Sequence, residues 1–262
     1  MKRITENIEL VEKLSEGGTA NVYLGVNTWT GFPVAVKELK SNFFKSEFLR
    51  KKFKEEANKY LYLNHPNIVK LQDFVDAGDT QYLVMEFIEG HDLNEYQSKV
   101  TGPMPTPMAA LLMSEVLKAL EYAHKNGVIH LDVKPSNVML STDNEIKVLD
   151  FGISQDSSDK SSGKLMGTPN YMSPEQIDGS GIDHRTDIYA AGVSLYELIT
   201  GKPPFNDCQD RKQLFEAIKN RPIPRIPGER YVNMIIQKAT AKNKKQRYQN
   251  CGEFYKDLYE LV

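Results

Sequence analysis

The chain has 262 residues, with 33 Lys and Arg against 35 Asp and Glu, so its formal net charge is −2. Hydrophobic residues make up 40% of the chain and charged residues 26%, a mixture that excludes a disordered tail or a collagen-like rod and is typical of a soluble globular protein. The near-neutral charge also argues against a general nucleic-acid binder, whose affinity rests on a basic excess.

The cysteines and the start of the chain indicate a reducing compartment. Cys208 and Cys251 form neither a disulfide framework nor a C-x-x-C metal motif. The first residues lack the apolar stretch of a secretory signal peptide, and no run has the composition of a membrane span. We therefore expect a cytoplasmic location and no membrane segment in this chain.

Short β-prone runs with a few turn signals dominate the first ninety residues. These runs are residues 22–26, 34–36 and 82–85. Apolar residues at helical spacing predict one amphipathic helix between them. They are Phe53, Ala57, Tyr60 and Leu61. The helix should stop near Pro66, because proline cannot continue a helix.

After about residue 90 the pattern becomes helical. An apolar-rich helix is predicted over 109–124 with a stop at Asn126-Gly127, and a helix buried on all sides over 188–199. The stretch 231–261 predicts two amphipathic helices around a basic connection, which we expect to be solvated. The Ser-rich patch 155–164 is typical of a mobile loop.

Strands first and helices second predict an α+β protein with two lobes. The expected limits are 1–88 for a β-rich, nucleotide-binding lobe and 89–262 for a mainly helical, catalytic lobe. Ligand sites favour the cleft at such a joint.

The segment from Leu14 to Val22 contains a small-residue turn at Gly17 and Gly18. Backbone N–H groups can approach a phosphate only where side chains are small, so the turn is a candidate phosphate loop. A plain Gly-Gly hairpin is the commoner alternative.

Lys37 ends the apolar strand 34–36 and faces opposite to Val34 and Val36. A lysine aimed into a cleft can hold phosphate oxygens if an acid orients it. Glu56 on the following helix is the candidate acid, and Glu55 is its rival. A surface lysine is the alternative.

The most specific motif combines Asp132, Lys134 and Asn137, followed thirteen residues later by Asp150. Asn137 and Asp150 offer hard oxygen ligands of the kind that Mg²⁺ prefers. Asp132 could accept a hydroxyl proton, and Lys134 could neutralise charge on a moving phosphoryl group. A chance arrangement in this order and spacing is improbable.

With these pieces in order, the sequence from about Leu10 to Leu261 resembles a eukaryotic-type (Hanks-type) protein kinase, most like the bacterial Ser/Thr branch. Ser173-Pro174-Glu175 and Asp187 continue the family's order. The resemblance implies a bilobal fold, ATP and Mg²⁺ (or Mn²⁺) as cofactors, and protein substrates. It also implies that Glu175 pairs with Arg247 as a structural ion pair.

Carried over residue by residue, the resemblance assigns catalytic roles to Lys37, Glu56, Asp132 and Lys134, and metal binding to Asn137 and Asp150. The residues that it implies for ATP binding are Leu14, Gly17, Gly18, Val22, Ala35, Lys37, Met85, Glu86, Ile88, Asp92, Met139, Leu149 and Asp150. Lys134 and Thr168 match the Ser/Thr-specific pattern, with Thr168 near the substrate. The candidate phosphorylation sites are Ser157, Ser158, Ser161, Ser162 and Thr168, although the Ser-rich loop could equally be an inert linker.

Several positions depart from the family pattern. Leu131 stands where most members have the arginine that pairs with an activation-loop phosphate, so we expect activity to depend little on such phosphorylation. Ser15 and Ala20 replace two loop glycines but stay small. His130 is expected to be a packed structural residue. The remaining histidines show no ligand spacing and are expected to be ordinary surface or turn residues.

Two alternatives from other classes stay open. A pseudokinase would bind nucleotide or a partner without transferring phosphate, and a small-molecule kinase would share the fold. The residues that separate an active kinase from a pseudokinase are all of the type that catalysis requires, which favours the enzyme. They are Lys37, Asp132, Asn137 and Asp150. The substrate, the activating signal and the oligomeric state are not readable from the sequence.

Overall fold

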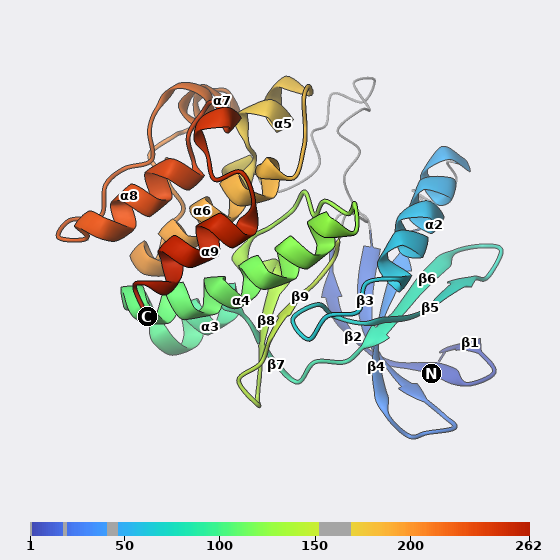
Figure 1. Cartoon of the computed structure of the whole chain (residues 1–262). Helices are drawn as coiled ribbons and strands as arrows, with labels where there is room; N and C mark the ends of the chain where they lie inside the picture. Colours follow the sequence, from blue (N-terminus) through green and yellow to red (C-terminus); the bar gives the residue numbers. More distant parts are fainter. Residues whose placement is uncertain (1, 18–19, 41–46, 152–168) are drawn as a thin grey trace. The chain divides into compact units, whose positions relative to one another are not determined.

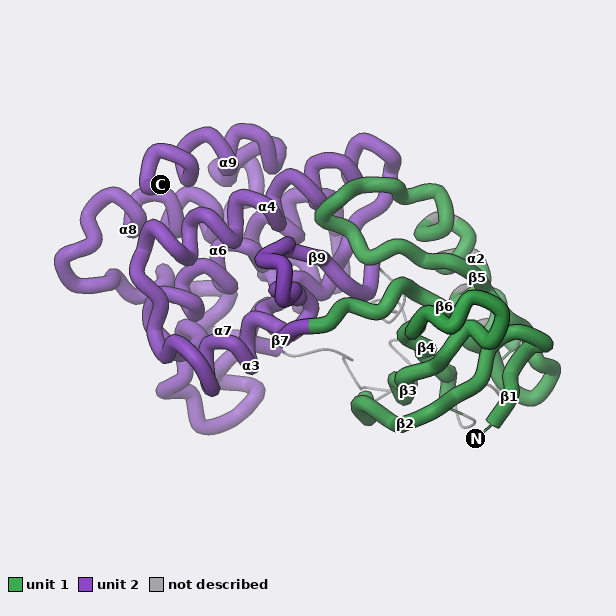
Figure 2. The backbone as a smooth tube through the Cα atoms, turned by 90° about the horizontal axis from the view of Figure 1, so that it is seen from below, with its two compact units in different colours: residues 1–89 green, residues 90–262 purple. Residues whose placement is uncertain are grey.

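The structure is a computed structural model that describes residues 2–17, 20–40, 47–151 and 169–262. Within helix α2 it leaves out the side chains of Phe48, Leu49, Lys52, Glu55, Glu56 and Lys59. The chain divides into two compact units, Met1–Glu89 and Gly90–Val262 (Figure 2). This boundary lies one residue beyond the expected limit at 88.

The first unit is built on an antiparallel sheet with the strand order β1-β2-β3-β4-β6-β5 (Figure 1). Its strands are β1 (Lys2–Thr5), β2 (Ile8–Glu16), β3 (Ala20–Asn27), β4 (Pro33–Leu39), β5 (Leu71–Asp76) and β6 (Gln81–Glu86). The three predicted runs lie in β3, β4 and β6. Sequential strands joined by short turns produce this meander, except that α2 (Glu47–Leu61) separates β4 from β5.

One face of this sheet carries an apolar core. Its members are Ile8, Leu10, Val34, Val36, Tyr82 and Val84. The predicted helix is confirmed as α2, which ends at Leu61, five residues before Pro66. Its periodic residues Phe53, Ala57 and Tyr60 are buried, and the Tyr60 hydroxyl donates to the carbonyl of Val69 at 2.5 Å. Leu61, the fourth residue of the expected apolar set, is instead 39% exposed at the last position of the helix.

The second unit is mainly helical, with a small antiparallel sheet in the order β7-β8-β9. The sheet consists of β7 (Gly90–Asp92), β8 (Val138–Ser141) and β9 (Ile146–Val148). The helices are α3 (Leu93–Tyr96), α4 (Thr106–Lys125), α5 (Pro174–Asp178), α6 (Arg185–Thr200), α7 (Arg211–Asn220), α8 (Arg230–Ala239) and α9 (Cys251–Tyr259). Short helical turns lie at η1 (Gln97–Thr101), η2 (Pro135–Asn137), η3 (Pro169–Tyr171) and η4 (Lys244–Gln246). The α+β class is confirmed.

Helix α6 forms the centre of this unit. Nearly all its residues are buried, as the apolar run 188–199 predicted. It packs against both α4 and α8, and α9 lies along α4 (Figure 1). Gly192 allows the close approach to α8, because a Cβ atom there would lie 2.8 Å from the Cβ atom of Ala239.

The helix ends follow from local sequence chemistry. Gly127 and Gly201 lie just past α4 and α6 with φ angles of 74° and 79°, a left-handed conformation that suits glycine. Asp210 and Asn250 cap α7 and α9 by accepting the N–H of the third residue beyond them. The predicted stop at Asn126-Gly127 is confirmed.

In the described parts of the chain, no helix combines the length and apolar character that a membrane crossing requires.

Candidate active site

In the first unit, four of the predicted ATP-binding residues share one face of the sheet. Val22 lies directly across from Lys37 on the neighbouring strand, and Ala35 lies across from Met85. Opposed residues in an antiparallel pair point to the same side, and so do residues two apart on one strand. These residues therefore lie on the face opposite the apolar core.

Lys37 is 5% exposed in spite of its charge. Val34 and Val36 face the apolar core, so Lys37 points to the opposite side of the strand, as the sequence predicted. A buried lysine requires polar or anionic partners, because removing an ammonium group from water is costly in free energy. Glu56 lies in α2, but its side chain is outside the described residues, so the expected pair with Lys37 stays a prediction.

The glycine-rich turn closes the β2–β3 hairpin. The N–H of Gly17 donates to the carbonyl of Ala20 at 2.9 Å, and a Cβ atom at Gly17 would lie 3.0 Å from that oxygen. Gly18 lies outside the described residues. Leu14 is 47% exposed on β2, beside an irregularity in the register between Lys13 and Ser15. The hairpin is therefore present, and a role in phosphate binding stays a prediction.

The predicted adenine-contacting backbone begins at Glu86, the last residue of β6. Its N–H donates to the carbonyl of Lys70 at 3.0 Å, and its Oε1 accepts the N–H of Lys70 at 2.8 Å. The N–H of Glu86 is therefore already used within the first unit, and the expected contact of the Glu86 backbone with adenine stays a prediction. Ile88 follows beyond the strand and is half-buried.

In the second unit, Asp92 lies directly across from Met139 on the small sheet. Asp92 also caps the short helix α3, because its Oδ1 accepts the N–H of Glu95 at 2.8 Å. Burial raises the pKa of Asp92 above its usual value, although hydrogen bonds from backbone N–H groups oppose the rise. The predicted ribose and adenine residues of this unit are thus strand neighbours.

Asp132 is the centre of a compact group of polar side chains. The ammonium of Lys134 donates to Asp132 Oδ2 at 2.7 Å. The amide nitrogen of Asn137 donates to the same oxygen at 2.9 Å and to the backbone carbonyl of Asp132 at 2.8 Å. Both side-chain donors bind Oδ2, and the expected role of Asp132 as the acceptor of a hydroxyl proton stays a prediction. The structure brings together the three residues that the motif singled out.

Asn137 and Asp150 lie at the same end of the β8–β9 hairpin. Val138 pairs with Val148, and the N–H of Leu149 donates to the carbonyl of Asn137 at 2.9 Å. Both amide hydrogens of Asn137 are donated to Asp132, so its side-chain oxygen is the atom that a cation would meet. Among the described residues no group of three or more His, Cys, Asp or Glu is positioned to hold a metal ion.

Asp187 holds the backbone of the segment before Asp132. It is fully buried on α6, where its Oδ2 accepts the N–H of His130 and its Oδ1 accepts the N–H of Leu131, both at 2.8 Å. Burial opposes ionisation of Asp187, but the hydrogen bond from His124 and the nearby imidazoles outweigh it and lower its pKa. The carboxylate is therefore charged and fixes two consecutive backbone groups.

His130 is a packed structural residue, as expected. It has no exposed surface, and its Nε2 lies 2.7 Å from the carbonyl of Leu149. Its Nδ1 accepts the N–H of Asp132 at 3.2 Å, and its ring lies 4.7 Å from that of Phe151. The imidazole thus joins the loop at Asp132 to the segment that leads to Asp150.

Leu131 has a φ angle of 68°, which is uncommon for a residue with a Cβ atom. Asp187 binds its N–H, and the side-chain amide of Gln176 donates to its carbonyl at 3.0 Å. Gln176 is also the third residue of α5 and forms a capping box with Ser173. The left-handed backbone of Leu131 is therefore held by side chains from two helices.

His124 corrects one expectation. It was expected to be an ordinary surface or turn histidine, but its side chain is only 8% exposed and its Nε2 lies 2.7 Å from Asp187 Oδ2. The position near the end of α4 looked unremarkable because the partner is 63 residues away in sequence. A polar residue within the apolar run of α4 was the one available signal.

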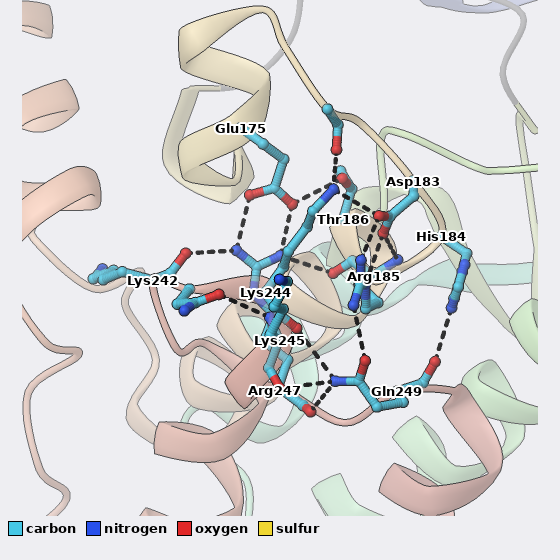
Figure 3. Close-up of polar contacts among 12 residues, drawn as sticks. Glu175, Asp183, His184, Arg185, Thr186, Lys242, Lys244, Lys245, Arg247 and Gln249 are labelled. Atoms are coloured by element: carbon cyan, nitrogen blue, oxygen red, sulfur yellow. Dashed lines mark hydrogen bonds and ion pairs between the residues drawn. The ribbon is translucent and has the colours of Figure 1, made fainter.

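The basic connection between α8 and α9 is solvated only in part. Asn243, Lys245 and Gln246 are exposed, whereas Arg247 is buried and its guanidinium binds the Glu175 carboxylate through two hydrogen bonds of 2.6 and 2.8 Å (Figure 3). Lys244 donates to Asp183 Oδ2 at 2.7 Å and also to the carbonyl of Gly181. The expected pair of Glu175 with Arg247 is present, and it ties this connection to α5.

A model of the family described as "Protein kinase domain" matches residues 8–261. The chain belongs to the protein kinase domain family. The resemblance drawn from the motifs is thereby confirmed.

Proteins with similar sequences include serine/threonine kinases of bacteria. The serine/threonine-protein kinase PknB of Mycobacterium leprae is 35% identical over 272 residues, which cover 98% of this chain and 43% of that protein. A probable serine/threonine-protein kinase of Clostridium perfringens is 38% identical over 269 residues, which cover 99% of this chain and 39% of that protein. The chain therefore spans less than half the length of these relatives.

The fold has close counterparts among solved structures. The PknI kinase domain of Mycobacterium tuberculosis matches with a TM-score of 0.78 at 24% identity, covering 98% of this chain and 97% of the other. This similarity shows the fold. Thr168 and the four candidate phosphorylation sites, Ser157, Ser158, Ser161 and Ser162, lie outside the described residues of the kinase domain.

Proposed function

We propose that this kinase domain is a serine/threonine protein kinase, which transfers the γ-phosphoryl group of ATP to hydroxyl groups of proteins. The observation that carries the proposal is the group formed by Asp132, Lys134 and Asn137, in which one oxygen of Asp132 receives two donors at 2.7 and 2.9 Å. The sequence similarity to bacterial serine/threonine kinases supports the choice of substrate class.

The chemistry divides among residues of the two units. Asp132 would accept the proton of the attacking hydroxyl, and Lys134 would stabilise charge on the transferred group. Lys37 would hold the phosphates with Glu56 as its acid partner. The adenine and ribose would contact the remaining residues of the set, namely Leu14, Gly17, Gly18, Val22, Ala35, Met85, Glu86, Ile88, Asp92, Met139 and Leu149.

The donor set fits a magnesium ion that completes its shell from the nucleotide. Asn137 and Asp150 provide hard oxygens, and Mg²⁺ is usually bound by one or two such protein groups together with substrate phosphates and water. Asn137 and Asp150 would hold the metal, which would supply positive charge against the charge that develops on the phosphates. A titration of activity with Mg²⁺ and with Mn²⁺ would decide which ion serves better.

Regulation follows from Leu131. A leucine cannot pair with a phosphate, so we infer that activity depends little on phosphorylation of the loop that contains Ser157, Ser158, Ser161 and Ser162. Autophosphorylation there is compatible with this inference but would not be required. The variant with alanine at all four serines should retain most activity, and loss of most of it would contradict the inference.

The free thiols and the use of ATP are consistent with a cytoplasmic site of action.

The deciding experiment is an assay with radiolabelled ATP and a generic protein substrate. Wild type should label the substrate, and Asp132→Asn should lower kcat at least about 100-fold, because the proton acceptor is lost. Asp143→Asn, in the exposed turn between β8 and β9, is the matched control and should label normally. Equal labelling by wild type and Asp132→Asn would overturn the proposal. Nucleotide binding without any labelling by wild type would indicate a pseudokinase.

A further inference from the structure

The thiol of Cys251 contacts the histidine that supports Asp187. Cys251 is the first residue of α9 and has no exposed surface. Its Sγ lies 3.7 Å from Nδ1 of His124, within the longer range that hydrogen bonds to sulfur require. Helices α4 and α9 pack along each other at this point (Figure 1). The contact therefore joins the start of one helix to the end of the other.

The opposite edge of the His124 ring decides which atom donates. Nε2 lies 2.7 Å from Asp187 Oδ2, and an ionised carboxylate only accepts hydrogen bonds. Nε2 must therefore carry a hydrogen, and in the neutral ring Nδ1 is an acceptor. Burial, together with the negative charges of Asp187 and Glu121, raises the pKa of the Cys251 thiol, so Sγ retains the hydrogen that Nδ1 can accept.

The other groups near the ring are engaged elsewhere or lie at ring-contact distance. Glu121 accepts the N–H of Gly252 at 3.0 Å and pairs with Lys125 at 3.1 Å. The ring of His184 lies 5.5 Å from that of His124 at an angle of 58°. Cys251 thus supplies the donor that the geometry of Nδ1 calls for.

The contact extends to the segment that carries Asp132. Asp187 Oδ2 accepts hydrogen bonds from Nε2–H of His124 and from the N–H of His130, while Oδ1 accepts one from the N–H of Leu131. Rotation or tautomer exchange of His124 would remove one donor from Oδ2 and let the carboxylate turn. His130 in turn accepts the N–H of Asp132. The position of Asp132 thus depends on how His124 is held.

We propose that Cys251 is a positioning residue for the kinase reaction: its S–H donates to Nδ1 of His124 and fixes the tautomer and orientation in which Nε2–H is donated to Asp187. The inference rests on the kinase activity proposed above. The plain alternative is that Cys251 only fills space as a small buried residue, in which case its hydrogen is irrelevant.

The test combines ¹⁵N NMR of the His124 ring with steady-state kinetics on the 262-residue chain. The variants are Cys251→Ala, which removes the donor, and Cys251→Ser, which keeps one. Leu258→Ala is the matched control, because Leu258 is a fully buried residue on the same helix that makes no contribution to the chain of contacts described above. Thermal unfolding of each variant reports the loss of packing alone.

We expect Cys251→Ala to move the Nδ1 resonance to the position of an unbonded imidazole acceptor at mildly alkaline pH. It should lower kcat about 2- to 10-fold with little change in KM for ATP, which is the effect expected from one weak hydrogen bond. Cys251→Ser should restore most of both signals. Leu258→Ala should lower the unfolding temperature at least as much and leave the Nδ1 resonance unchanged.

An Nδ1 resonance that is identical in wild type and Cys251→Ala would overturn the proposal. So would a loss of kcat that follows unfolding temperature across all three variants. If the resonance moves as expected but wild type transfers no phosphate, the contact stands and the proposed kinase function fails. The two inferences therefore fail separately.

Discussion

Arg247 binds Glu175 across 72 residues of sequence with two nearly parallel hydrogen bonds, Nη1 to Oε1 at 2.6 Å and Nη2 to Oε2 at 2.8 Å. The Arg247 side chain has no exposed surface, and its remaining donors reach the carbonyls of Ala241, Lys242 and Arg185. A planar guanidinium suits this arrangement, because its donors form a rigid fork. Five acceptors are thus gathered around one cation, and the connection between α8 and α9 is fixed to α5 and α6 (Figure 3).

Arg247→Met should destabilise the domain strongly. It would leave Glu175 buried without its counter-charge, a change that typically costs about 3 to 5 kcal/mol in the free energy of unfolding. Chemical denaturation measures the effect. Lys99→Met is the control, because the Lys99 pair with Glu95 is exposed on both sides and should contribute little to stability. If both variants lost the same free energy of unfolding, the buried pair of Arg247 with Glu175 would stabilise the domain no more than an exposed pair does.

The stability of the domain should fall in acid, partly through Glu175. Burial alone would raise the pKa of Glu175, but the hydrogen bond and charge of Arg247 outweigh it and lower the pKa. A carboxyl group whose pKa is lowered by folding stabilises the fold above its unfolded pKa of about 4.3, and this contribution is lost as the pH falls through the folded pKa. Unfolding free energy measured against pH should therefore fall less steeply in Glu175→Gln than in wild type. Asp143→Asn should parallel wild type, and a parallel Glu175→Gln curve would refute the assignment.

Lys242 should make stability rise with pH in the alkaline range as well. Its Nζ is buried with no hydrogen-bond partner among the described residues, and lies 5.6 and 5.4 Å from the ring centroids of Tyr189 and Phe205. Burial, and then the charge of Arg247, lower its pKa from 10.5 to about 8. Between these values the unfolded chain binds more protons than the folded one, so stability rises with pH.

The variant Lys242→Met removes this titration. The stability of wild type relative to Lys242→Met should increase as the pH is raised from about 8 to about 10.5. Unfolding free energies of the two proteins, measured across that window, provide the comparison. A difference that stays constant or shrinks would mean that the two rings stabilise the ammonium enough to cancel its burial.

Asn137→Asp should damage catalysis in a pH-dependent way. The amide nitrogen of Asn137 lies 2.9 Å from Asp132 Oδ2, so the substitution would put two carboxylates in contact, and they cannot both ionise without cost. We expect kcat to fall at least about 100-fold and the acid limb of the pH–rate profile to move to higher pH. Asn137→Ala should lower kcat without moving that limb. Identical profiles in the two variants would contradict the role of the contact.

Gly192 should resist enlargement because α6 and α8 approach closely there. A Cβ atom at this position would lie 2.8 Å from both the Cβ atom of Ala239 and Cγ2 of Thr240. Gly192→Ala should cost about 1 to 3 kcal/mol through overpacking. Combining it with Ala239→Gly and Thr240→Ser should recover part of the loss, and a thermodynamic cycle measures the coupling. Purely additive effects would show that the helices adjust without strain.

Much of the fold followed from local patterns. The strands around Val22, Val34 and Val84 and the helices near Ala57 and Leu117 carry their period in the sequence, and the structure confirms them. The grouping of Asp132, Lys134 and Asn137 was also accessible, because the three residues lie within six consecutive positions and need no long-range information to meet.

The contacts that could not be predicted from the sequence join residues that lie far apart in the chain. The partners of His124 are Asp187 and Cys251, 63 and 127 residues away, and nothing in the local pattern indicates which helix faces it. In the basic connection the resemblance implied the partner of Arg247, but nothing in the local pattern indicated that Lys244 binds Asp183, 61 residues away. Such pairings depend on how helices pack, which periodicity does not encode.

The way in which residue 131 is held has an evolutionary consequence. Its N–H and its carbonyl are bound by Asp187 and Gln176, so both contacts would be the same for any side chain at that position. The chain could therefore exchange residue 131, which our proposal links to control by a phosphate, without rebuilding the loop that bears Asp132. A lineage could lose or regain this form of control by a single substitution while keeping its chemistry intact.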